Sequence, residues 1–127
     1  MSPRVQSRPK LMSERGTAAI EYAIILPAFL LCTLGVLDTA RLFWTNTTLQ
    51  RAVSMAARCP PTQCPGAGQI KDKAIAEAWS LELQPQAVTV VKQNCGMRVT
   101  ASYPFTFSVP GFDPITLTST SCFATGP

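Results

Sequence analysis

The hydrophobic positions begin with an almost unbroken apolar run over residues 17–37. The sixteen residues between Glu21 and Asp38 carry no charge. The 21 residues of the run match the roughly 20 that cross a hydrocarbon core of about 30 Å as a helix. The run therefore predicts a membrane-spanning helix, with a kink at Pro27 that a membrane helix tolerates.

Helical periodicity continues beyond the apolar run. Apolar residues recur at spacings of three and four, and no glycine or proline occurs between Val36 and Cys59. One helix over residues 17–58 would be roughly 60 Å long at about 1.5 Å per residue. Its amphipathic second half needs a surface to pack against. Asp38 and Arg41 have opposite charges and i,i+3 spacing on this helix.

The rest of the chain predicts a short helix and three strands. After a proline- and glycine-rich break, apolar residues at helical spacing predict a second helix over residues 69–83, with Trp79 packed against the sheet. Residues 97–109 alternate between apolar and polar side chains, which predicts a strand with one buried face. Residues 87–92 and 115–123 predict its neighbours. The expected fold is α+β, with a three-stranded antiparallel sheet laid on the second half of the long helix.

Charge is distributed unevenly along the chain. The net charge of +4 is concentrated in the first 16 residues, which carry +3 and leave +1 for the remainder. The basic character therefore belongs to a leader and not to a nucleic-acid-binding surface, so we expect no nucleic-acid partner. Basic residues before a span also favour a cytoplasmic leader.

Glu21 is a carboxylate within a segment suited to hydrocarbon. An unpaired carboxylate there costs on the order of 2–3 kcal/mol on lenient insertion scales. Such a residue usually has a partner and a function. The alternative is that Glu21 sits at the depth of the lipid headgroups, because it is near the start of the run.

The segment Gly16-Thr-Ala-Ala-Ile-Glu21-Tyr22 resembles the processing motif of Flp-type prepilins. Over residues 16–42 the chain is similar to the TadE-like family of pseudopilins. The resemblance implies cleavage by a prepilin peptidase between Gly16 and Thr17, which makes Glu21 and Tyr22 the fifth and sixth residues of the mature chain. It also implies a pilin-like fold that packs through its N-terminal helix against other pilin and pseudopilin subunits of a tight-adherence (Flp, type IV-like) pilus. About 70 residues follow the helix, which indicates a minor pilin.

This interpretation divides the chain into three parts. They are a cleaved basic leader (residues 1–16), a transmembrane and stem helix (17–58) and a disulfide-bonded extracytoplasmic head (59–127). The expected location is the bacterial cytoplasmic membrane, crossed once, with the head in the periplasm. A secretory signal fits less well, because the apolar run exceeds the usual h-region of about 7–15 residues. An unprocessed single-span protein with an extracytoplasmic binding head stays open as the alternative.

Five cysteines have two different meanings. Cys32 lies in the apolar run and is most simply a small apolar residue. The other four lie beyond the run and suggest two disulfides, for which three connectivities are possible. We favour Cys59–Cys64, across the proline-rich turn, and Cys95–Cys122, between the start of the middle strand and the end of the last one. A four-cysteine zinc site is the competing interpretation, but the spacing lacks paired C-x-x-C motifs.

Composition argues against an enzyme. The chain has no histidine and seven acidic residues, and it offers no combination of nucleophile, base and orienting group. It also lacks a glycine-rich phosphate-binding loop. We therefore expect no catalytic residue, metal, cofactor or small-molecule substrate.

Overall fold

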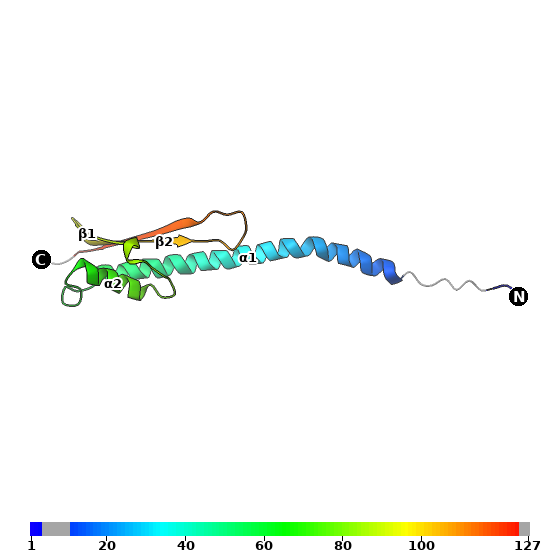
Figure 1. The fold of residues 1–127 in the computed structure, drawn as a ribbon, viewed down its shortest axis with the longest axis horizontal. Coiled ribbons are helices and arrows are strands. Elements are labelled where there is room, and N and C mark those ends of the chain that lie inside the picture. Colours follow the sequence, from blue (N-terminus) through cyan, green and yellow to red (C-terminus); the bar gives the residue numbers. More distant parts are fainter. Residues whose placement is uncertain (4–10, 125–127) are drawn as a thin grey trace.

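The computed structural model describes the chain at residues 1–3 and 11–124, and side chains at residues 1–3 and 16–124. Three helical elements and three strands make up the fold (Figure 1). Their bounds are α1 Leu11–Ala57, α2 Ala67–Glu77, the 3-10 turn η1 Pro85–Ala87, β1 Val88–Gln93, β2 Gly96–Phe105 and β3 Ile115–Phe123. The predicted α+β fold is confirmed.

The molecule is elongated because α1 extends far beyond the elements that pack on it. Figure 1 shows the sheet and α2 gathered along the C-terminal half of α1, while the N-terminal half projects alone. Every residue from 16 to 33 is exposed, and the first partly buried position is Leu34. Within the described chain, α1 is the one helix long and apolar enough to cross a membrane.

The sheet is antiparallel with strand order β1-β2-β3. Val99, in the central strand, is opposite Val90 on one side and Ser121 on the other. Gly96 begins β2 with φ +114°, and a Cβ there would collide with the backbone of Phe123. Glycine is therefore required for the tight β1–β2 turn, which brings the end of β3 alongside.

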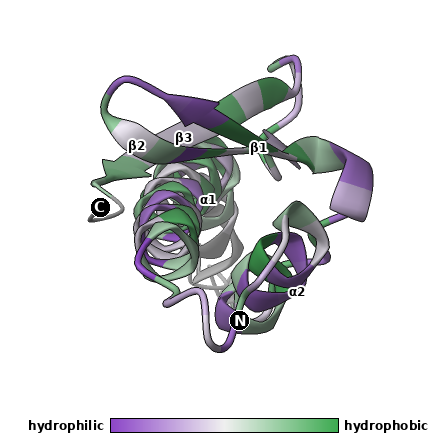
Figure 2. Ribbon diagram, turned by 90° about the vertical axis from the view of Figure 1, so that its left-hand side faces the viewer, coloured by the Kyte–Doolittle hydropathy of each residue, from purple (hydrophilic) through white to green (hydrophobic). Residues whose placement is uncertain are grey.

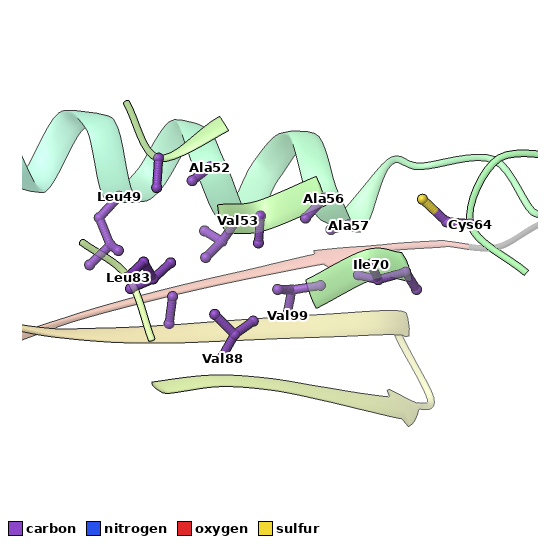
Figure 3. Close-up of a cluster of buried hydrophobic side chains, with 13 residues drawn as sticks. Leu49, Ala52, Val53, Ala56, Ala57, Cys64, Ile70, Leu83, Val88 and Val99 are labelled. Carbon is purple, nitrogen blue, oxygen red and sulfur yellow. The ribbon is translucent and has the colours of Figure 1, made fainter. Parts of the chain in front are cut away.

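The core lies between α1, α2 and the inner face of the sheet (Figure 3). Figure 2, which looks along α1, shows the sheet on one side of this helix and α2 on another. Small side chains on α1 let both partners approach closely, since Ala52 and Ala56 are fully buried beside Val53. Ile70 and Val99 cover them from α2 and β2. The amphipathic second half of α1 therefore packs against the head of its own chain.

Two predicted helix ends differ from the structure by more than two residues. The long helix begins at Leu11 and not at residue 17, because no glycine or proline between residues 11 and 15 interrupts it. The second helix ends at Glu77 and not at residue 83. Ala78 leaves the helical conformation, and the chain continues extended, which buries Leu83.

Two further predictions were wrong in the head. β2 ends at Phe105 and not at residue 109, because the N–H groups of Ser108 and Val109 bind a carboxylate on α1. Trp79 does not pack against the sheet. Its ring lies 4.9 Å from the guanidinium carbon of Arg51 and it stays 61% exposed.

Candidate functional site

The predicted processing residues all lie on the exposed first part of α1. The peptide bond between Gly16 and Thr17 is helical, in the second turn of α1. A Cβ at Gly16 would meet no atom within 4 Å, so packing does not explain a glycine here. Glycine weakens a helix by about 0.5–1 kcal/mol relative to alanine. The predicted cut therefore lies at a position where the helix is locally easier to unwind.

Glu21 and Tyr22 project from α1 without support from the head. Both are exposed, Tyr22 at 73%. Within residues 16–124 the carboxylate of Glu21 has no hydrogen-bond or ion-pair partner. Thr17 and Glu21 are four residues apart and so lie on one face of the helix. The Glu21 carboxylate is thus available to a group outside the described chain.

The helix around Glu21 is apolar on all sides. A helix of this kind is typical of a membrane span or of a buried position among other helices. Apart from the partly buried Leu34, the large apolar side chains of this stretch are each at least half exposed. They are Ile20, Tyr22, Ile24, Ile25, Leu26, Phe29, Leu30, Leu31, Val36 and Leu37.

A second cluster lies where the apolar run ends. The Asp38 side chain is almost completely buried, and its Oδ2 accepts hydrogen bonds from the N–H groups of Ser108 (2.7 Å) and Val109 (3.0 Å). Its Oδ1 lies 3.1 Å from the guanidinium of Arg41. The same guanidinium donates to Ser108 Oγ at 2.8 Å and lies over the Phe105 ring. These contacts fix the end of the sheet to α1.

The surroundings of Asp38 favour its ionised form. Desolvation by burial would raise the pKa of this carboxyl, but it is outweighed. Hydrogen bonds from Val109 and Ser108, together with the charge of Arg41, hold the pKa below the ordinary value of 3.8. The sequence pattern predicted the pair with Arg41 but missed both backbone donors, which lie about 70 residues later.

The head is closed by two disulfides. Cys59–Cys64 spans the turn after α1, with Cα atoms 5.8 Å apart. Cys95–Cys122 joins the β1–β2 turn to the end of β3, with Cα atoms 6.2 Å apart. The favoured pairing is confirmed, and the four thiols that a zinc site would have used form bridges. Cys32 is a free, exposed thiol on α1.

Comparison with protein families identifies the long helix. Residues 16–58 match the family model of TadE-like proteins. The chain carries a TadE-like segment. The match begins at Gly16, at the predicted cleavage site, and ends one residue beyond α1. The TadE-like segment covers about a third of the chain and leaves the head unmatched. Comparisons with curated proteins and with solved structures found no match.

Proposed function

We propose that this protein is a pseudopilin, a minor pilin that takes part in assembly of a tight-adherence (Flp, type IV-like) pilus. One observation carries the proposal. The first part of the TadE-like segment, residues 16–37, is helical and of membrane length, and its apolar side chains are exposed apart from the partly buried Leu34. Such a surface is stable in lipid or among the helices of other subunits, and not in water.

In this proposal the first half of α1 crosses the bacterial cytoplasmic membrane and the head faces the periplasm. Disulfides form in oxidising compartments, which supports an extracytoplasmic head. The basic residues of the leader support its cytoplasmic position. The leader residues 4–10 lie outside the part of the chain that the structure describes.

A prepilin peptidase removes the leader by cutting between Gly16 and Thr17. The open space around Gly16 leaves the backbone accessible, and the absence of a Cβ lets the peptidase approach closely once this turn of α1 unwinds. The cut gives Thr17 a new α-ammonium group one helical turn before Glu21.

Glu21 then acts in the contact between subunits. In the packed helices its carboxylate meets the α-ammonium group of a neighbouring subunit. Two opposite charges removed from water together cost less than either alone, because their attraction offsets part of the desolvation. The pair therefore favours one register between subunits over random association of apolar helices.

The N-terminus of the mature protein tests this proposal. We expect mass spectrometry to find a chain that starts at Thr17 in cells with the prepilin peptidase, and the full chain in cells without it. Gly16→Leu should block the cut, whereas Gly35→Leu, the same change at another open helical glycine, should not. A start at Met1 or Ser2 in both strains would select an unprocessed single-span protein with a binding head. A start beyond Leu37 would select a secreted domain.

A further inference from the structure

The loop that joins β2 to β3 (residues 106–114, the β2–β3 loop) reaches the end of the apolar run. In Figure 1 this loop, in orange, turns back beside the middle of α1. Val109 and Phe112 line a hollow of about 260 Å³ together with Gly35 and Asp38. Gly35 belongs to the apolar run, about half a helical turn before its end. The loop therefore extends to the level at which α1 would enter the bilayer.

The tip of this loop is apolar and rigidly supported. Phe112 is 65% exposed and follows the exposed pair Pro110 and Gly111. Its ring centroid lies 5.6 Å from that of Phe107, which in turn packs edge-on against Phe105 at 5.2 Å. The row of rings leads from the core to the surface. Phe112 is thus presented outward from a fixed base.

Residues of α1 extend the same apolar surface. Phe43 is 69% exposed and lines a neighbouring hollow that shares Gly35 and Thr39 with the one beneath Phe112. Trp44 is 65% exposed. Aromatic side chains concentrate at the two surfaces of a bilayer, where the ring sits among the headgroups. Phe112, from the C-terminal part of the sequence, adds a third aromatic residue near the end of the span.

The charges around the loop do not favour an anionic surface. Arg41 is paired with Asp38, and the exposed Asp113 adjoins Phe112. Attraction to this surface must therefore come from apolar contact, so the lipid headgroups need not be acidic.

From these observations we propose that the β2–β3 loop inserts Phe112 into the periplasmic face of the same bilayer that α1 crosses. The inference rests on the membrane span in the proposed function. The surface formed by α1 and the loop is continuous, so lipid that surrounds the end of α1 also meets Phe112. A second point of contact then fixes the rotation and tilt of the head, and the subunit gives up that contact when it leaves the membrane.

Tryptophan fluorescence in brominated lipid tests the insertion. The full chain is reconstituted in phosphatidylcholine vesicles, one set with bromine near the headgroup end of the acyl chains and a second set with bromine near their methyl end, which lies at the depth of Phe29. Phe112→Trp is made in a background with Trp44→Phe and Trp79→Phe. The matched control carries Trp44→Phe alone and reports from Trp79, which packs on Arg51, about 20 Å beyond Asp38 at 1.5 Å per residue. Phe29→Trp in the first background reports on the span.

We expect bromine to quench the Phe112→Trp protein several-fold more strongly than the Trp79 control, at all protein-to-lipid ratios. One outcome would overturn the insertion and leave the span intact. In that outcome Phe29→Trp is quenched, but Phe112→Trp is quenched no more than the Trp79 control. If Phe29→Trp is also unquenched, both the span and the insertion are wrong. A further outcome is that quenching of Phe112→Trp disappears as the protein-to-lipid ratio rises. That result would mean that a second copy of the chain covers the loop, which also contradicts insertion.

Discussion

Asp38 in α1 accepts a hydrogen bond of 3.0 Å from the backbone N–H of Val109, which lies 71 residues later in the chain. This contact joins the end of the apolar run to the far end of the sheet. It also accounts for the end of β2 before Ser108, since the N–H groups of Ser108 and Val109 turn toward α1 and not toward a neighbouring strand. The head is therefore held along the helix at two places, by the apolar core and by this carboxylate.

Removing the negative charge of Asp38 should loosen the β2–β3 loop without unfolding the head. We expect Asp38→Asn to speed hydrogen exchange at the amides of Ser108 and Val109, because an amide oxygen is a weaker acceptor than a carboxylate. Amides of Val99 and Ala101, in the core, should change little. Asp72→Asn, on an exposed position of α2, is the control. Equal exchange at Ser108 in both variants would show that the hydrogen bonds do not hold the loop.

Acid should weaken the same contact. The folded pKa of Asp38 lies below its ordinary value of 3.8, so the unfolded chain takes up this proton first as pH falls. The stabilisation is fully present above the ordinary value and is lost as pH falls through the folded value. The melting temperature of the wild type should therefore drop more steeply below about pH 4 than that of Asp38→Asn. Parallel melting curves across this range would contradict the prediction.

The two disulfides should differ in their contribution to stability. In the chain-entropy model a bridge across 27 residues, as in Cys95–Cys122, stabilises by roughly 3.5 kcal/mol, and one across 5 residues, as in Cys59–Cys64, by roughly 2 kcal/mol. Paired serine substitutions at each bridge, followed by urea unfolding, measure the difference. A larger loss from the short bridge would mean that it supports the packing of α2 as well as the turn.

Local patterns predicted most of the fold. The last strand, predicted over residues 115–123, agrees with β3 at both ends. The second helix was predicted too long because Leu81 continues the helical spacing, yet this stretch of chain leaves the helix to return to the sheet. Sequence spacing cannot distinguish burial within a helix from burial of an extended segment.

The candidate sites were predictable to different degrees. Gly16 and Glu21 stand out locally, as a glycine that packing does not require and an acid in an apolar run. The partners of Asp38 did not stand out, because nearly every residue has a backbone N–H group and the sequence does not mark which of them bind a carboxylate. The aromatic tip at Phe112 was equally hidden. Its position beside the apolar run depends on the register of β2 against β3 and on how the sheet lies along α1.

The role of Glu21 gives the sharpest prediction about assembly. Glu21→Gln and Glu21→Ala should leave the head folded, because Glu21 is exposed and makes no hydrogen bond or ion pair within residues 16–124. Membrane insertion should stay intact or improve, since a carboxylate in the apolar run opposes it. Co-purification with other pilus subunits and surface adherence should fall, because the α-ammonium group of a neighbouring subunit loses its counter-charge.

A matched control separates this effect from a general loss of charge. Glu82→Gln removes a carboxylate from an exposed position in the head, and we expect it to preserve association and adherence. The mature N-terminus must be measured in the same samples, since a change at Glu21 that slows processing would lower assembly indirectly. The assembly role requires that correctly processed Glu21→Ala still associates poorly. If that protein is processed, associates and adheres as the wild type does, Glu21 only sits at headgroup depth and plays no part in assembly.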